Sequence, residues 1–247
     1  MASDKNRRIV ANYDEVARVS PLDILLTGRY SSSAFGYASR LGRFLADEME
    51  LKPTDRVLDA GCSVGIYHPE LAARAGTLVG IDASPRSIER AQARHKDLSN
   101  VEYRIVELTD LKASDFPRPF DKILCYSVVH FLGDMAEFEA LMRAFIGLLD
   151  GGHGMIFLGE VREREMYERF QQEQNKSYLR NVKFSLLKKI QKWLLRSGTY
   201  VAADAPTLFS RQEIADLVAR LGGKCERIEQ ASWHPFYNTC ADYRLRF

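Results

Sequence analysis

Hydrophobic positions along the chain follow two patterns that alternate between residues 56 and 159. Short apolar runs have the length of buried strands, and between them apolar residues recur every three or four positions, as on one face of a helix. The pattern predicts strands at Arg56–Ala60, Thr77–Ile81, Val101–Val106, Phe120–Ser127 and Gly154–Gly159. It predicts intervening helices at Leu71–Ala75, Ser84–Lys96 and Asp134–Leu149.

This alternation of strands and helices predicts an α/β fold. A helix between two strands brings the chain back to the same edge of the sheet, so the two strands run parallel. Right-handed crossovers then place helices on both faces. We therefore expect a doubly wound, mostly parallel sheet.

Two segments lie outside the alternation. Residues 1–50 are predicted to form a helical cap, because apolar residues recur at helical spacing within Ala34–Met49. Residues 161–205 are predicted to form a long, highly charged helical insert after the fifth strand. The sheet domain then comprises residues 51–160 and 206–247.

The chain after the insert returns to the pattern of the sheet domain. Ser210 is a candidate N-cap, and Glu213 three positions later completes a capping box. The helix that starts there is expected to end at Leu221, before Gly222 and Gly223. The last two predicted strands are Cys225–Glu229 and Asp242–Phe247.

Composition adds few constraints. The chain has 247 residues, 46% hydrophobic and 28% charged, which suits a globular domain. Its net charge of +2 does not by itself indicate nucleic-acid binding. No stretch has the apolar length of a signal peptide or of a bilayer span, so a soluble cytoplasmic protein is expected.

The cysteines are scattered along the chain. No C-x-x-C pair occurs, which argues against a zinc site and a disulfide framework, and no metal is expected. Reduced thiols fit a cytoplasmic compartment. The four cysteines are Cys62, Cys125, Cys225 and Cys240.

The segment after the first predicted strand carries the most specific chemistry. Gly61 and Gly65 form a turn that lets the backbone approach a ligand, and a helix begins beside it with free N–H groups. Asp82 ends the next strand about 20 residues after Gly61, the separation expected in one βαβ unit. A carboxylate there can accept both hydroxyl hydrogens of a ribose.

Together these residues resemble the class I S-adenosylmethionine-dependent methyltransferases. The family pattern is an acidic residue followed by three alternating glycines, and Asp59, Gly61 and Gly65 match it while Ser63 replaces the middle glycine. The resemblance implies a Rossmann-like fold with S-adenosyl-L-methionine as cofactor and S-adenosyl-L-homocysteine as product. If Ser63 needs a positive φ, it will be mildly strained.

Further matches assign the cofactor contacts that the resemblance implies. Glu107 would face the adenine amine with Leu108 beside the ring, Arg86 would stack on adenine, and Tyr126 would touch the methionine part. Tyr13 lies in a segment similar to the family's cofactor lid. The implied cofactor-binding residues are Tyr13, Asp59, Gly61, Cys62, Gly65, Asp82, Ala83, Arg86, Glu107, Leu108 and Tyr126.

Three alternatives remain at this point. Residues 61–65 also match G-x-S-x-G, the nucleophile elbow of α/β-hydrolases, with Ser63 as nucleophile. Against this alternative, no strands are predicted before the motif to build the hydrolase sheet, and Asp82 would have no role. A nicotinamide dehydrogenase would need G-x-G-x-x-G, which is absent. A relative that binds the cofactor without catalysis is a third alternative.

The methyl acceptor is the least determined part of the hypothesis. His130, just after the fourth strand, is the best-placed general base for a hydroxyl or a protonated amine, although it could instead be structural. His68 and His234 are weaker candidates. We expect a small-molecule acceptor, such as a sugar, a lipid-linked intermediate or a natural product.

The charged insert is the sequence's clue to that acceptor. Residues 176–196 contain seven basic residues and no acidic one, on an amphipathic helical pattern. Inserts at this place form an acceptor lid in many members of the family. The alternatives are an anionic or phosphorylated acceptor, peripheral contact with a membrane surface, or a helix that only packs on the core. Nucleic acid is disfavoured, since no recognised binding module is present.

Overall fold

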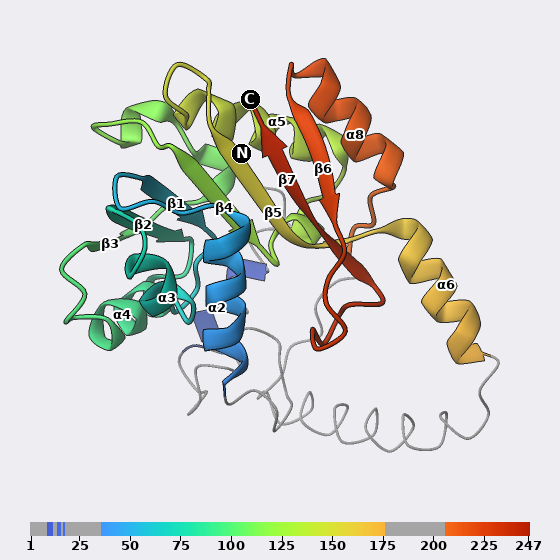
Figure 1. The fold of residues 1–247 in the computed structure, drawn as a ribbon, viewed down its shortest axis with the longest axis horizontal. Coiled ribbons are helices and arrows are strands. Elements are labelled where there is room, and N and C mark those ends of the chain that lie inside the picture. Colours follow the sequence, from blue (N-terminus) through green and yellow to red (C-terminus); the bar gives the residue numbers. More distant parts are fainter. Residues whose placement is uncertain (1–8, 12–13, 16, 18–35, 176–205) are drawn as a thin grey trace.

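The computed structural model describes residues 9–11, 14–15, 17, 36–175 and 206–247. Its central feature is a seven-stranded sheet with the strand order β3-β2-β1-β4-β5-β7-β6 (Figure 1). The strands are β1 (Arg56–Ala60), β2 (Thr77–Asp82), β3 (Val101–Ile105), β4 (Lys122–Tyr126), β5 (Met155–Arg162), β6 (Lys224–Ile228) and β7 (Cys240–Arg246). The predicted strands all occur, and the predicted fold class is confirmed.

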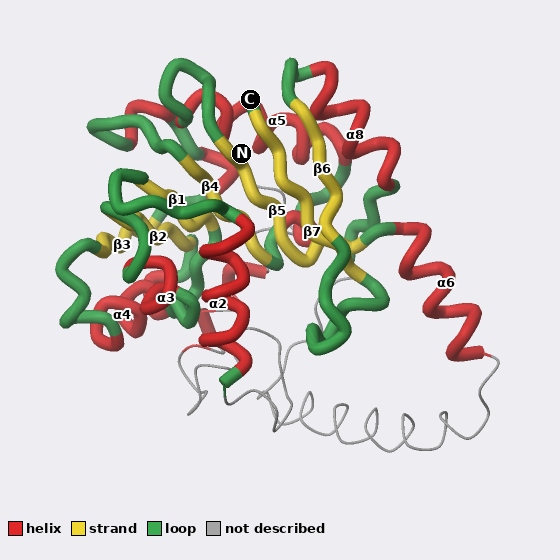
Figure 2. The backbone as a smooth tube through the Cα atoms, in the orientation of Figure 1, coloured by secondary structure: helices red, strands yellow, loops and turns green. Residues whose placement is uncertain are grey.

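Helices connect the strands and cover the sheet (Figure 2). The α-helices are α2 (Tyr37–Glu48), α3 (His68–Ala72), α4 (Pro85–Arg94), α5 (Met135–Leu148), α6 (Arg164–Asn175) and α8 (Arg211–Arg220). Short 3-10 helices are η3 (Leu108–Asp110), η4 (Ala113–Asp115) and η5 (Val129–Phe131). Among the residues that the structure describes, no helix is long and apolar enough to cross a membrane.

The direction of the strands creates the place for a ligand. Strands β1 to β5 pair in parallel, whereas β7 runs antiparallel to both β5 and β6. The chain leaves the centre through β2 and β3, then crosses to the other side of β1 to form β4 and β5. At such a switch point the loops after neighbouring strands diverge, which opens a crevice at the carboxyl ends of β1 and β4.

Neighbouring residues of strand β1 belong to two separate hydrophobic cores. Leu58 belongs to a core with Phe138 of α5 and Leu217 of α8, while the preceding Val57 belongs to a core with Leu41 of α2. All five side chains are completely buried. Burying a side chain of this size contributes about 1.5–3 kcal/mol, so helices on both faces of the sheet hold its centre rigid.

Helix ends follow local sequence signals. Ser210 accepts a hydrogen bond from the N–H of Glu213, whose carboxylate accepts one from the N–H of Ser210, so the predicted capping box is confirmed. The predicted helix Leu71–Ala75 is misplaced: α3 begins at His68, because Pro69 in its first turn favours a helix start there.

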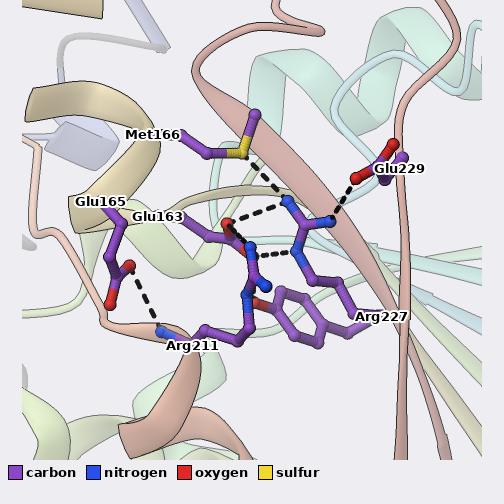
Figure 3. Close-up of polar contacts among 7 residues, drawn as sticks. Glu163, Glu165, Met166, Arg211, Arg227 and Glu229 are labelled. Atoms are coloured by element: carbon purple, nitrogen blue, oxygen red, sulfur yellow. Dashed lines mark hydrogen bonds and ion pairs between the residues drawn. The ribbon is translucent and has the colours of Figure 1, made fainter. Parts of the chain in front are cut away.

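The fifth strand is longer than its apolar pattern predicts. It continues to Arg162 through a register shift between Leu158 and Val161, where Glu160 has a φ of 51°. Glu163 follows and is completely buried between the sheet and α6. Its carboxylate pairs with Arg227 of β6 at 2.5 Å and accepts a hydrogen bond from Tyr243 of β7 (Figure 3).

Candidate active site

The described residues form a cavity of about 180 Å³ at the carboxyl ends of the strands around β1. Its walls come from the loop after β1, the end of β2, the segment around η3 and the loop after β4, with Ile9 and Val10 on the N-terminal side. Seven residues predicted from the sequence to bind the cofactor line it: Gly61, Cys62, Asp82, Ala83, Glu107, Leu108 and Tyr126.

The loop after β1 has a backbone conformation that glycine favours. Gly61 has a φ of 83°, and a Cβ there would lie 2.5 Å from Cγ2 of Val128. Gly65 also has a positive φ, of 64°. Ser63 adopts a φ of 49°, so the strain expected of a serine in place of the family's glycine is confirmed. The loop thereby brings its backbone against the cavity.

Asp82 connects this loop to the end of β2. Its Oδ2 accepts a hydrogen bond of 2.9 Å from the N–H of Ser63, and its Oδ1 accepts one of 2.9 Å from the N–H of Ser84. Burial raises the pKa of Asp82, although these backbone hydrogen bonds oppose the rise. Each carboxylate oxygen keeps a further lone pair that can accept a ligand hydroxyl hydrogen.

Asp59 lies behind the loop and not among the residues that line the cavity. Its Oδ2 is 2.9 Å from Nε2 of His68, whose Nδ1 is 2.7 Å from the hydroxyl of Tyr103. A Cβ on Gly65 would come within 2.7 Å of that same Nδ1. Asp59 therefore supports the loop through His68, a role that the sequence did not reveal because it depends on how side chains of β1, α3 and β3 meet.

The end of the cavity near β3 is lined by Glu107, Leu108 and Thr109. Arg86, predicted to stack on adenine, does not line it. Its Nε is instead 3.0 Å from Oδ2 of Asp14, and Oδ1 of Asp14 accepts a hydrogen bond from the hydroxyl of Ser84. The N-terminal segment thus attaches to the start of α4. Tyr13 lies outside the described residues.

The other end of the cavity, at the end of β4, is aromatic. Tyr126 and Tyr67 both line it, with ring centroids 5.7 Å apart and planes at 73°. The hydroxyl of Tyr126 is 3.0 Å from Nε2 of His234, in the loop between β6 and β7. His234 also contacts Glu160 and Tyr37, which sequence reasoning missed, since Glu160 follows the predicted end of its strand.

His130, the predicted general base, does not line the cavity. Its side chain is buried, with its ring centroid 4.1 Å from that of Phe131, and its carbonyl accepts a hydrogen bond from the N–H of Thr207. Its catalytic role stays a prediction. Among the described residues, no three acidic, histidine or cysteine side chains gather as metal ligands.

The hydrolase alternative receives no support from the geometry. A nucleophilic serine needs a base within hydrogen-bond distance of its oxygen. The Oγ of Ser63 is buried and has no hydrogen-bond partner among the described residues. Among the described residues no histidine bonds to it, so nothing in this part of the chain activates Ser63 as a nucleophile.

A sheet ordered 3-2-1-4-5-7-6, with a glycine loop after β1 and an acidic residue ending β2, defines the class I methyltransferase fold. The chain belongs to the family described as the methyltransferase domain, whose model matches residues 51–199. The family predicted from the sequence is therefore confirmed.

Similar proteins include Nodulation protein S and a ubiquinone biosynthesis O-methyltransferase. The chain is 25% identical over 129 residues to Nodulation protein S of Sinorhizobium fredii, covering 52% of this chain and 58% of that protein. It is 32% identical over 108 residues to the ubiquinone biosynthesis O-methyltransferase of Leptothrix cholodnii, covering 43% and 44% respectively. The matches thus span about half the length of these relatives.

Solved structures with bound S-adenosylhomocysteine share the fold. The magnesium protoporphyrin IX methyltransferase of Synechocystis PCC 6803 superposes with a TM-score of 0.62 at 14% identity, covering 98% of this chain and 99% of that chain. The N-methyltransferase NodS of Bradyrhizobium japonicum WM9 gives a TM-score of 0.59 at 18% identity, covering 95% and 97%. At these identities the likeness concerns the fold.

Proposed function

We propose that this protein transfers a methyl group from S-adenosylmethionine to an amine or hydroxyl of a small molecule. The observation that carries the proposal is Asp82, whose carboxylate holds the glycine loop and lines the same cavity. Family membership and a sheet that ends in this cavity support it.

The residues that line the cavity fit an adenosine. Asp82 can accept the ribose hydroxyl hydrogens, and Glu107 with Leu108 lies toward β3, the side where the base would follow. The buried Oγ of Ser63 has no partner within the described chain, so a ligand's polar group can supply one. Gly61 and Cys62 then border the cofactor's methionine part.

The cofactor supplies an electrophilic methyl group on a sulfonium. The chain's own contribution is to orient the acceptor toward that group and to exclude water, and orientation of this kind lowers a barrier by roughly 7–11 kcal/mol. The apolar residues around the cavity suit this task, since Ile9, Val10, Val128, Phe131 and Leu132 enclose it. We infer that the segment around Ile9 and Val10 acts as a cap over the cofactor. Most of the first 35 residues of the predicted cap, residues 1–50, lie outside the described residues.

Calorimetry with S-adenosylhomocysteine tests the proposal. Asp82→Ala should weaken binding by at least about tenfold, because two charge-assisted hydrogen bonds to the ribose disappear. Asp97→Ala, which removes an exposed carboxylate, is the matched control and should bind as the wild type does. Unchanged affinity in a folded Asp82→Ala variant would contradict the proposed site.

A further inference from the structure

Two tyrosine rings build a corner at the β4 end of the cavity. Tyr67 and Tyr126 meet edge to face, with centroids 5.7 Å apart, and both line the cavity. The ring of Tyr126 lies directly on Gly159, where a Cβ would come within 1.9 Å of its Cδ2. Aromatic faces carry partial negative charge, so a corner of two rings attracts a cation.

The hydroxyl of Tyr126 is held by a buried histidine. Nε2 of His234 lies 3.0 Å from the oxygen of Tyr126, 2.6 Å from that of Tyr37 and 3.1 Å from Oε1 of Glu160. Nδ1 of the same ring accepts a hydrogen bond of 3.2 Å from the N–H of Phe236. Because Nδ1 accepts, the ring's hydrogen lies on Nε2 and is donated to one of the three nearby oxygens at a time.

Two buried acids, Glu160 and Asp242, lie in this neighbourhood. Burial raises the pKa of Asp242 to about 7, so Asp242 carries only part of a negative charge near neutral pH. Glu160 is 2% exposed and Asp242 is completely buried, and the N–H of Glu160 donates a hydrogen bond of 2.8 Å to Oδ1 of Asp242. Burial raises the pKa of Tyr126 well above its usual value, and the charges of Asp242 and Glu160 raise it further. A positive charge in the tyrosine corner would be stabilised by the same field.

The strand order places the reacting end of the cavity at this corner. This step depends on the proposed function, in which the adenosine lies over the ends of β2 and β3. Since β4 lies on the opposite side of β1, the part of the cofactor beyond the ribose points toward Tyr126. Tyr67 and Tyr126 would then border both the sulfonium and the acceptor atom.

The residues at this end disfavour an acceptor that needs a base. Among the described residues that line the cavity, the carboxyl side chains are those of Asp82 and Glu107, both at the adenosine end. A hydroxyl acceptor must lose its proton to a nearby base during transfer. A neutral amine attacks with its own lone pair, whereas an amine that arrives as an ammonium must first release a proton to water.

We propose that the acceptor atom is an amine nitrogen and that the corner of Tyr67 and Tyr126, held by His234 and Glu160, receives the positive charge of the reaction. The nitrogen lone pair forms the new N–C bond as the S–C bond breaks, and that electron pair stays on sulfur. The charge moves from sulfur to nitrogen, and the resulting ammonium afterwards releases a proton to water.

Binding of two cofactor analogues tests the cation subsite without an acceptor. Sinefungin carries an ammonium group next to the position of the sulfonium, whereas S-adenosylhomocysteine has a neutral thioether. Calorimetry on the wild type should give sinefungin the lower dissociation constant by at least about tenfold. Equal dissociation constants would overturn the subsite.

Variants test whether the corner of Tyr67 and Tyr126 causes the preference for sinefungin. Tyr126→Leu and Glu160→Gln should each bring the two dissociation constants closer together, while Tyr126→Phe, which keeps the ring, should retain most of the preference. Glu229→Gln, with a side chain that is 88% exposed, is the matched control for Glu160→Gln. A full preference in a folded Tyr126→Leu variant would contradict the role of the ring.

Turnover distinguishes the acceptor atom. The wild type is incubated with S-adenosylmethionine labelled in the methyl group and with pairs of amines and alcohols that share one carbon skeleton. We expect the amine of a pair to be methylated faster, and an alcohol methylated faster than its amine would overturn the assignment. Failure of both analogues to bind the wild type would instead contradict the proposed function itself.

Discussion

Single residues of the glycine loop show how closely backbone conformation and binding are connected. Gly61, Ser63 and Gly65 all adopt positive φ values, and the N–H of Ser63 donates to Asp82. A positive φ is unfavourable for a residue with a Cβ, and for Ser63 it costs on the order of 1 kcal/mol. The loop keeps its strained shape because Asp82 and the packed residues below it hold it there.

Gly61→Ala should destabilise the protein by roughly 1–3 kcal/mol, because the new Cβ meets Val128 and the φ of 83° disfavours alanine. Urea unfolding measures the change. Gly147→Ala is the matched control: it lies in α5 with no atom near the added Cβ, and should stabilise the helix by about 0.5–1 kcal/mol. Equal stability of Gly61→Ala and the wild type would contradict the prediction, because the loop would then have moved to accommodate the added Cβ.

The residues of the glycine loop could be predicted from the sequence, but the side chains that they pair with could not. The glycines and Asp82 were identified because their spacing is local to one βαβ unit. The pairing of Asp59 with His68 and of Arg86 with Asp14 could not be predicted, since each depends on where side chains from separate elements meet. His234, a weak candidate in the sequence, proved to lie beside Tyr126 for the same reason.

At the scale of elements, apolar periodicity located the strands well and their ends less well. Strand β1 has the predicted bounds, because Val57, Leu58 and Ala60 give it an apolar run and every residue from Val57 onward is buried. Strand β5 extends beyond its prediction, since the charged residues Glu160 and Arg162 interrupt its apolar run. Glu160 and Glu163, which directly follows the strand, are buried acids. Their burial is explained by partners that lie on β6, β7 and the loop between them.

The attachment of α6 to the sheet gives a prediction for an element. Burial by itself would raise the pKa of Glu163, but hydrogen bonds from Arg227 and Tyr243 and the charge of Arg227 lower it overall. Glu163→Gln should cost roughly 3 kcal/mol at neutral pH, because it leaves the partly buried guanidinium of Arg227 without its carboxylate. Urea unfolding at several pH values measures this cost.

The pH dependence has a definite sign. A carboxylate whose pKa is lowered by folding stabilises the protein above its unfolded value, and that stabilisation is lost as the pH falls through the folded value. The gap between wild type and Glu163→Gln should therefore shrink as the pH drops below 4.5. Glu165→Gln, an exposed neighbour, is the control (Figure 3). A difference in unfolding free energy between wild type and Glu163→Gln that does not change with pH would contradict a stabilising role for the charge of Glu163.

For the whole molecule, one sheet assembles a site from segments far apart in the chain. The loops after β1, β2, β3 and β4 converge because parallel strands end at the same edge of the sheet. The order of the strands therefore sets the order of the lining residues along the cavity, from Glu107 through Asp82 to Tyr126. The antiparallel β7 then brings His234 to the same edge from the end of the chain. Fold and site are in this way consequences of a single topology.

A crystal structure of the protein with S-adenosylhomocysteine would show the proposed site itself. We predict ribose hydroxyls within hydrogen-bond distance of Asp82, adenine beside Glu107 and Leu108, and the thioether sulfur at the corner of Tyr67 and Tyr126. An adenosine bound outside this cavity, or with its ribose away from Asp82, would contradict it.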